Sequence, residues 1–529
     1  KLSKERVFLR EATGLVREAG ALDILAFASL NISWGLSAMW LFLWGPYYAP
    51  GGDLYSGITL VLVPMIFGSL AWAFLASVMP RSGGDFIFNS RALHPLLGFL
   101  SSLGWVCVNF IWCATLSAYV ASPALSMLSY SMGWTAAGDF VSSGLGIFLI
   151  GTFVIGFSSL ILIWGLRPYL RLQVVMFAFG VLMFLIMWGL MAATSRADFV
   201  AGWNAFSARY GSGTFAEIIS TAKADGISIT PSLEATLLLM PVAFWGLGYP
   251  YLATYIAGET KKVHRSVMIG VPGGLLLCGI SWYITNFFLQ ANVGQEFLAS
   301  VAYLGGNVMA PYAIPFYPMF HLFPAVLTQN PIIVFLLGWG FVCWIFMYAI
   351  YSILPQSRIA LAWAFDRIAP SFFGYVSDRF RTPVKGIIFF AVGGEIVLFI
   401  YAFFTPAILV SFTAMIPQIL TTFMLTSIAA MVLPFRKRVK PVYEASPVSK
   451  YRLGPIPFVS ICGFIYFVLL LSVLYYFFTN PGLGALYYPS LAVIVAIYVF
   501  GIAYFYAMRA YRKRQGIEID LAFKELPPE

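Results

Sequence analysis

Twelve long apolar runs dominate this sequence and limit what the chain can fold into. A helix that crosses a lipid bilayer needs about 20 consecutive, mostly apolar residues. Runs of this kind cover 22–46, 56–79, 96–128, 143–166, 171–194, 233–257, 267–291, 331–354, 385–404, 408–433, 455–478 and 486–508. The third run is longer than a bilayer requires, so it extends beyond the membrane or tilts. The sequence therefore predicts an all-α polytopic membrane protein with 12 transmembrane helices.

The composition excludes a water-soluble globular chain. Charged residues make up 10% of the 529 residues and apolar ones 60%, whereas soluble domains carry about 25% charged residues. The net charge of +10 forms no continuous basic face, so no nucleic acid partner is predicted. All five cysteines lie inside apolar runs, and the three histidines (His94, His264 and His321) lie in loops. We therefore predict no metal site and no cofactor.

The distribution of basic residues predicts the orientation in the membrane. An even number of spans places both termini on one side, and 28 of the 31 Lys and Arg residues fall on that side. The other side keeps Arg196, Arg209 and Lys223, all in one loop. By the positive-inside rule, both termini are expected in the cytoplasm. The short, charged ends lack a signal peptide and are typical of a prokaryotic plasma-membrane protein.

Two spans are interrupted near their middle, which is where a transporter would bind its substrate. Small and polar residues cluster in the first and sixth spans, the first helices of two five-helix halves. Interruptions at corresponding positions of two halves indicate a binding site between inverted repeats. The alternative is that the glycines only allow close helix packing. The predicted substrate-binding residues are Ser33, Trp34, Gly35, Ser37, Phe244, Trp245, Gly246 and Gly248.

Four loop motifs resemble those of the amino acid–polyamine–organocation (APC) transporter superfamily over about residues 15–510. Met79-Pro80-Arg81-Ser82-Gly83-Gly84 is similar to its P-R-S-G-G loop, and Arg91-Ala92-Leu93-His94-Pro95 to its R-A-L-G-P sequence. The stretch from Gly258 to Arg265 resembles its E-x-K-N-P-x-R sequence. Ser357-Arg358, Ala364 to Pro370 and Arg381-Thr382-Pro383-Val384 follow in the family's order.

This resemblance implies a LeuT-type fold of two inverted five-helix repeats and two peripheral helices. The repeats would cover 22–194 and 233–433, separated by an extracellular loop, 195–232. A cytoplasmic segment at 1–21, a cytoplasmic loop at 434–454, peripheral helices at 455–508 and a cytoplasmic tail at 509–529 complete the expected organisation. In this fold the carboxylate and amine of a substrate meet the broken middles of spans 1 and 6.

The sequence also departs from the family in ways that bear on ion coupling. Ser33-Trp34-Gly35 replaces the G-S-G triplet, and Gly180 stands near the lysine of some proton-coupled members. Between Leu336 and Leu354 the eighth span has only one hydroxyl besides its tyrosines, Ser352. The Ser/Thr pair of sodium-coupled relatives is therefore missing, and we expect transport without sodium.

Charged residues supply candidates for gating and coupling. Arg81 and Glu259 are equally consistent with an inner gate of ion pairs and with solvated charge. For Arg358 and Asp366 we expect solvated or topogenic charge. Glu395 lies deep in the ninth span, where an acid is costly unless it is protonated or paired. It is either a structural acid or a proton-coupling residue.

Together these features predict a secondary active transporter of amino acids that works by alternating access in a lipid bilayer. Spans 1, 3, 6, 8 and 10 have no acid near mid-depth, which favours neutral, apolar amino acids over polyamines or cationic ones. The alternatives are a cationic amino acid or polyamine carrier of the same fold, a channel, or a transport-like sensor. A membrane enzyme would need converging acids, bases or nucleophiles, which the candidate core lacks. The sequence does not indicate the oligomeric state.

Overall fold

The computed structural model describes residues 12–404, 416–483 and 488–527. Residues 1–11 of the predicted amino-terminal segment and 408–415 of the tenth predicted span lie outside this part. Within it, 12 helical segments are long and apolar enough to cross a membrane. They are Ala21–Tyr48, Leu54–Val78, Pro95–Ser131, Gly144–Trp164, Leu166–Ala193, Leu233–Glu259, Val263–Val293, Pro331–Phe365, Val384–Phe403, Ile416–Phe435, Phe458–Thr479 and Leu491–Arg514. The predicted all-α polytopic class is confirmed.

Several spans are single helices and others are built from consecutive pieces. The single helices are α4 (Leu54–Val78), α9 (Gly144–Trp164), α10 (Leu166–Ala193), α19 (Val384–Phe403), α23 (Phe458–Thr479) and α24 (Tyr488–Arg514). The first span is divided into α1 (Ala21–Ile32), α2 (Trp34–Met39), η1 (Trp40–Trp44) and α3 (Gly45–Tyr48). The other composite spans are α6 (Pro95–Tyr119), η2 (Val120–Leu125) and α7 (Ser126–Ser131); α13 (Leu233–Leu247) and η3 (Pro250–Glu259); α14 (Val263–Phe288) and η4 (Leu289–Val293); α17 (Pro331–Tyr351) and α18 (Leu354–Phe365); α21 (Ile416–Val432) and η6 (Leu433–Phe435).

Short elements lie between the spans. The helices are α5 (Asp85–Ala92), α8 (Thr135–Ser142), α11 (Arg196–Ala208), α12 (Phe215–Ala224), α15 (Gln295–Gly306), α16 (Leu322–Ala325), η5 (Ser371–Gly374), α22 (Lys440–Ala445), η7 (Pro447–Lys450), η8 (Pro481–Leu483) and α25 (Ile519–Ala522). The strands β1 (Arg452–Leu453) and β2 (Ile456–Pro457) form an antiparallel hairpin in which Arg452 faces Pro457. The connection between the seventh and eighth spans holds α15 and α16. Sequence reasoning missed α5, α11 and α12.

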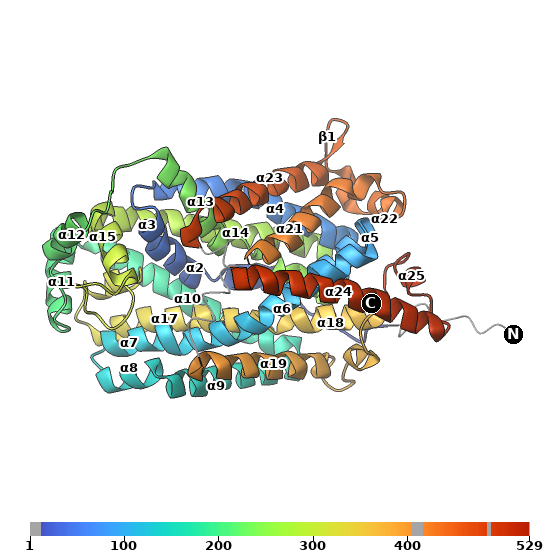
Figure 1. Cartoon of the computed structure of the whole chain (residues 1–529), viewed down its shortest axis with the longest axis horizontal. Helices are drawn as coiled ribbons and strands as arrows, with labels where there is room; N and C mark the ends of the chain where they lie inside the picture. The colour runs from blue at the N-terminus through green and yellow to red at the C-terminus, as the bar shows by residue number, and fades with distance from the viewer. Residues whose placement is uncertain (1–11, 405–415, 484–487, 528–529) are drawn as a thin grey trace.

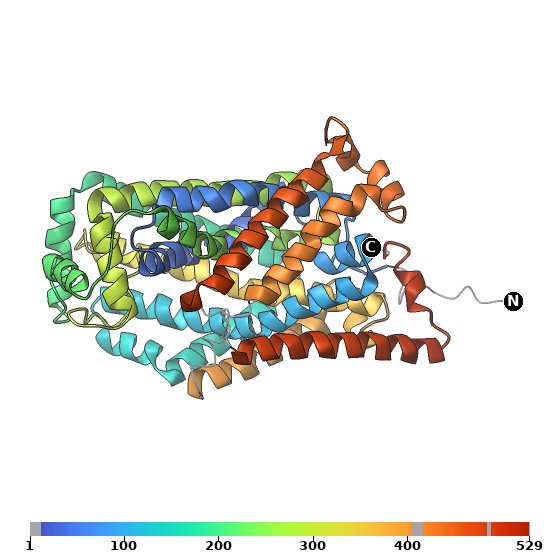
Figure 2. The same cartoon turned by 45° about the horizontal axis from the view of Figure 1, so that its top comes forward.

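The bundle has two distinct ends (Figure 1 and Figure 2). One end carries α5, α22 and α25, close to the carboxyl terminus, and we call it the terminal end. The other carries α11, α12 and α15, and we call it the opposite end. The first, sixth and eighth spans bury 89, 78 and 72% of their most apolar windows, whereas the twelfth buries 17%. Spans 1, 6 and 8 therefore form the centre of the protein.

The eighth span is longer than predicted. A run ending at Leu354 was expected, with a cytoplasmic loop after it. Instead the chain bends at Ser352 and Ile353 and continues as α18 to Phe365, with Pro355 in its first turn. Proline is well tolerated there because the first backbone N–H groups of a helix have no partner within the helix. Arg358 therefore lies in a buried helix rather than in a solvated loop.

Candidate functional site

Both predicted helix interruptions are present. In the first span, Ser33 separates α1 from α2 and has a φ of 51°, in the left-handed region. In the sixth span, α13 ends at Leu247 and the tighter helix η3 begins at Pro250, which leaves Gly248 and Tyr249 between them. Tyr249 has a φ of −121° and a ψ of 23°, outside helical values. Each interruption frees backbone groups from the helical hydrogen-bond ladder.

The two interruptions face each other and are joined by hydrogen bonds. The side-chain amide of Asn31, two residues before the first break, donates to the carbonyl oxygen of Tyr249. The Ser37 hydroxyl lies 3.2 Å from the carbonyl oxygen of Gly246 and also donates to that of Ile32. In the first span, the Ser33 hydroxyl donates to the Trp344 carbonyl of α17 over 3.0 Å. The two breaks and the eighth span thus meet at one point in the centre of the bundle.

A cavity of about 800 Å³ reaches this point from the opposite end. Ser37 and Trp245 are the two predicted substrate-binding residues in its wall, and Val308 and Tyr317 mark where it reaches the exposed surface. Most of the remaining wall is aromatic or aliphatic. Its aromatic members are Trp40, Trp44, Tyr48, Trp112, Tyr119, Tyr312, Phe316, Tyr348, Tyr401 and Phe477. None of the described residues that line it is Asp, Glu, Lys or Arg.

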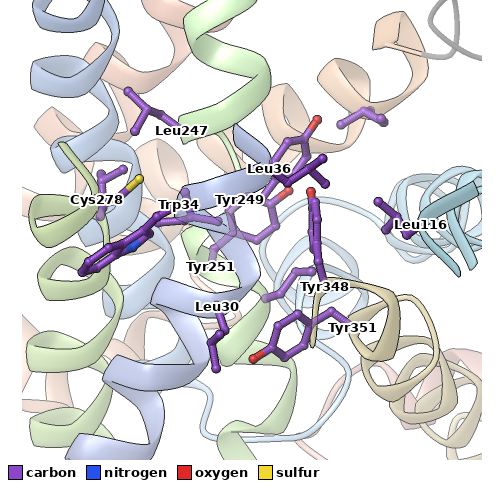
Figure 3. Packing of buried hydrophobic residues seen from close by; sticks show 14 of the residues in the cluster. Leu30, Trp34, Leu36, Leu116, Leu247, Tyr249, Tyr251, Cys278, Tyr348 and Tyr351 are labelled. Atoms are coloured by element: carbon purple, nitrogen blue, oxygen red, sulfur yellow. The ribbon is translucent and has the colours of Figure 1, made fainter. Parts of the chain in front are cut away.

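The other predicted site residues lie behind the cavity wall. Trp34 was predicted to bind substrate, but its ring stacks on Trp344 at a centroid distance of 5.3 Å and does not line the cavity. In Figure 3 it is directed toward Cys278 and away from Tyr348. The same figure shows Tyr249 and Tyr348 near Leu36, on the other side of α2. Trp245 instead stacks on Trp40 at 5.5 Å, within the wall.

The glycines at the breaks allow close helix packing. A Cβ atom on Gly35 would lie 2.7 Å from the ring of Trp344, and one on Gly246 would lie 2.4 Å from Trp282. These glycines therefore allow neighbouring helices to pack closely, as the alternative interpretation predicted. The two helices are nevertheless also interrupted beside them.

A buried ion pair lies at the terminal end. The Arg358 guanidinium of α18 donates two hydrogen bonds of 2.9 Å to the Glu259 carboxylate at the end of η3. Both side chains are 1% exposed. The backbone N–H groups of Glu18 and Ala19 also donate to the Glu259 carbonyl oxygen, at 2.8 and 3.1 Å. These contacts hold η3 against α18 and the segment before α1.

A second buried ion pair lies at the same end. Arg91 of α5 donates to both carboxylate oxygens of Asp366, at 2.5 and 2.8 Å, and both side chains are at most 2% exposed. The expectation of solvated charge at Arg358 and Asp366 is therefore wrong. An unpaired buried charge costs several kcal/mol, so each of these residues needs its partner. The signal in the sequence that could have indicated these buried pairs is that Arg91, Glu259, Arg358 and Asp366 each lie in a short stretch rich in apolar residues.

Arg81 and Glu395 lie outside the two buried ion pairs. The Arg81 side chain donates to the carbonyl oxygens of Pro80 and Pro527, which places it against the carboxyl-terminal segment. Glu395 is partly exposed and accepts a hydrogen bond from Thr152 between α9 and α19. It does not line the cavity. The partner of Glu259 in the described structure is thus Arg358, a residue that had been assigned to solvated charge.

Comparison with known proteins agrees with this architecture. A family model described as amino acid permease matches residues 50–509. Over 160 residues the chain is 29% identical to "Cationic amino acid transporter 3, mitochondrial" from Arabidopsis thaliana. That segment covers 30% of this chain and 23% of the relative, so the match spans less than a quarter of the relative's length.

Proposed function

Because the chain belongs to the amino acid permease family, we propose that it is a secondary active transporter of neutral, apolar amino acids. It would work by alternating access between two inverted repeats, 22–194 and 233–433. The observation that carries this proposal is the meeting of the two helix breaks at the inner end of an uncharged cavity.

The proposed substrate position lies between the breaks. The first turn of the helix that starts at Trp34 has backbone N–H groups that suit a carboxylate. The carbonyl groups of Gly246 and Tyr249 suit an ammonium group, and in the structure they accept hydrogen bonds from Ser37 and Asn31. A zwitterion would replace these internal bonds. The predicted residues Ser33, Trp34, Gly35, Ser37, Phe244, Trp245, Gly246 and Gly248 would thus act mainly by shaping the backbone, with Ser37 and Trp245 in direct contact.

The wall of the cavity favours a neutral substrate with an apolar side group. A guanidinium or a second ammonium buried among aromatic side chains would lose its hydration without gaining a carboxylate partner, at a cost of several kcal/mol. An apolar side group would instead gain about 25 cal/mol for each Å² removed from water. The similarity to a cationic amino acid transporter supports the competing proposal of a cationic substrate.

Competition binding separates these two proposals. Purified protein is mixed with radiolabelled leucine and challenged with excess phenylalanine, alanine, arginine, lysine or putrescine. We expect the neutral amino acids to displace leucine and the cations to have little effect. Stronger competition by the cations would contradict the neutral assignment and support a cationic carrier.

The proposed gate and coupling also follow from this arrangement. Glu259 and Arg358 form the closed gate at the terminal end, where Arg81 joins the carboxyl-terminal segment to the loop before α5. We propose that the protein lies in the plasma membrane with both termini in the cytoplasm. Glu395 remains a candidate for proton coupling, although its contact with Thr152 lies outside the cavity wall.

A further inference from the structure

Asp85 is a buried acid that the proposed transport mechanism does not use. It is the first residue of α5 and follows Gly83 and Gly84, whose φ angles of 117° and 52° bring the chain back toward the bundle. Its side chain is fully buried. One carboxylate oxygen accepts a 2.6 Å hydrogen bond from Ser101 of α6, and the other accepts a 2.6 Å bond from the Tyr255 hydroxyl of η3. Asp85 therefore links three elements at the terminal end.

The contact between Asp85 and η3 is tight. The backbone N–H of Gly83 donates to the Tyr255 carbonyl oxygen at 3.1 Å. A Cβ atom on Gly84 would lie 2.6 Å from the Tyr255 ring, so the glycine is needed for this approach. The Tyr255 ring also stacks on Trp72 of α4. Tyr255 lies four residues before Glu259 on η3, so a movement of η3 that opened the proposed gate at Glu259 would carry Tyr255 away from Asp85.

The surroundings of Asp85 favour its protonated form. Burial raises the pKa of the Asp85 carboxyl from 3.8 to about 6, although hydrogen bonds from Ser101, Tyr255 and the backbone N–H groups of α5 lower it in part. Besides Cys107, Cys113 and Tyr119, which lie farther along α6, the ionisable groups on the neighbouring elements are Tyr251, Tyr255 and Glu259 of η3, Arg358 of α18 and Arg91 of α5. Glu259 is paired with Arg358 and Arg91 with Asp366. The packed faces of α6 and α21 present the hydroxyls of Ser101 and Thr426.

We propose that Asp85 is a proton-binding site that links closure of the terminal end to pH. The site holds its proton while Tyr255 covers it, and it releases the proton to the terminal side when η3 moves away and water reaches the carboxylate. This inference rests on the proposed alternating-access function. Asp85 would influence the position of η3, and so the gate, through its contact with Tyr255, and it lies apart from the proposed substrate site.

The sign of the pH effect follows from proton linkage. A pKa raised in the closed state means that protonation stabilises the closed state relative to an open state with a hydrated carboxylate of ordinary pKa. The effect is absent above the raised pKa of about 6, grows as the pH falls and is complete below about 4. Between pH 7 and pH 5 the ratio of open to closed protein is expected to fall about tenfold.

Infrared difference spectroscopy can detect the proton directly. Wild-type protein is titrated from pH 8 to pH 4, and the C=O band of protonated carboxyl groups is followed. We expect a band with a midpoint near pH 6 that Asp85→Asn removes, while Asp378→Asn, a change of an exposed acid at the same end, leaves it in place. Tyr255→Phe keeps the ring against Trp72 but removes one hydrogen bond to the carboxylate, so it should move the midpoint upward. An Asp85 that stays ionised over this pH range would give neither the titrating band nor the shift.

Spin-label distances then test the link to the gate. Labels on Lys261→Cys and Arg379→Cys, both exposed in the native chain, report the separation of η3 from the loop after α18. An unsubstituted chain treated in the same way gives the background from the five native cysteines. The long-distance population should fall from pH 7 to pH 5 in the wild type and stay constant in Asp85→Asn.

The outcomes distinguish this inference from the proposed function. The inference is overturned if Asp85→Asn keeps the titrating band, if the midpoint lies below pH 4.5, or if the distances do not respond to pH while leucine binding is intact. A band that titrates near pH 6 in a protein that binds no amino acid would instead overturn the proposed function and leave the proton site standing. If Asp85→Asn does not fold, the direction of the shift in Tyr255→Phe decides the question.

Discussion

Breaking the buried pair of Glu259 and Arg358 should open the terminal end. The pair is held by two 2.9 Å hydrogen bonds, and both side chains are 1% exposed. Removing one partner of such a pair leaves an uncompensated buried charge, which costs about 3–5 kcal/mol. In an open state water can hydrate the remaining charge, so most of this cost falls on the closed state. A shift of about 3 kcal/mol changes the ratio of open to closed protein by about a hundredfold.

Spin labels on Lys261→Cys and Arg379→Cys give the assay for this shift. Glu259→Gln and Arg358→Met should each produce a large long-distance population at neutral pH. The double variant Glu259→Met with Arg358→Met should return toward the closed distance, because two apolar side chains of similar volume can replace a buried ion pair at little cost. Glu444→Gln, which breaks the exposed pair of Lys440 and Glu444, should change nothing. Single variants with the wild-type distance distribution would refute the assignment of this pair as the gate.

Three further changes test other parts of the structure. Gly35→Ala and Gly246→Ala should lower the free energy of unfolding by about 1–3 kcal/mol, because the added Cβ atoms meet Trp344 and Trp282. Gly156→Ala and Gly189→Ala, whose Cβ atoms would have no neighbour within 4 Å, should not destabilise the protein. Equal melting temperatures for the two sets of variants would contradict the packing argument. Phe523→Ala removes a fully buried ring that contacts Arg91 and should cost about 3–5 kcal/mol, so limited proteolysis should cut the segment after Arg514 faster than in Tyr511→Ala, which changes an exposed side chain. Replacing sodium by choline on both sides of a proteoliposome should leave transport unchanged, and a steep sodium dependence would reveal a cation site that we have not identified.

The membrane architecture could be predicted from the sequence because it depends on long apolar runs. Such a run has few alternatives to a spanning helix, and each of the 12 predicted runs overlaps an observed span. The helix breaks were predictable for a related reason, since glycine and hydroxyl residues inside an apolar run are conspicuous. The end of the eighth span was missed because Pro355 looks like a helix terminator and can equally start the next helix.

The buried partners in the proposed gate and the proposed proton site could not be predicted in the same way. Arg358 and Asp366 look like ordinary loop charges in the sequence, and only the folded chain shows that Glu259 and Arg91 reach them. Asp85 was hidden within a loop motif, where its neighbours in sequence give no sign that Tyr255, 170 positions away, covers it. Trp34 was predicted to bind substrate because it adjoins the break, yet its ring packs on Trp344 and is not among the residues that line the cavity. Sequence position located the break but not the direction of each side chain.

Uptake of radiolabelled leucine into proteoliposomes tests the central claim most directly. Wild-type protein should give saturable uptake that excess phenylalanine suppresses and excess arginine does not, without an accompanying electrical conductance typical of a channel. Trp245→Ala removes part of the cavity wall and should weaken the apparent affinity at least tenfold, as expected from about 1.5–3 kcal/mol for a buried apolar side chain. Trp134→Ala, which changes a half-exposed tryptophan outside the cavity wall, should transport normally. Uptake that arginine suppresses better than phenylalanine, or that Trp245→Ala leaves unchanged, would contradict the account.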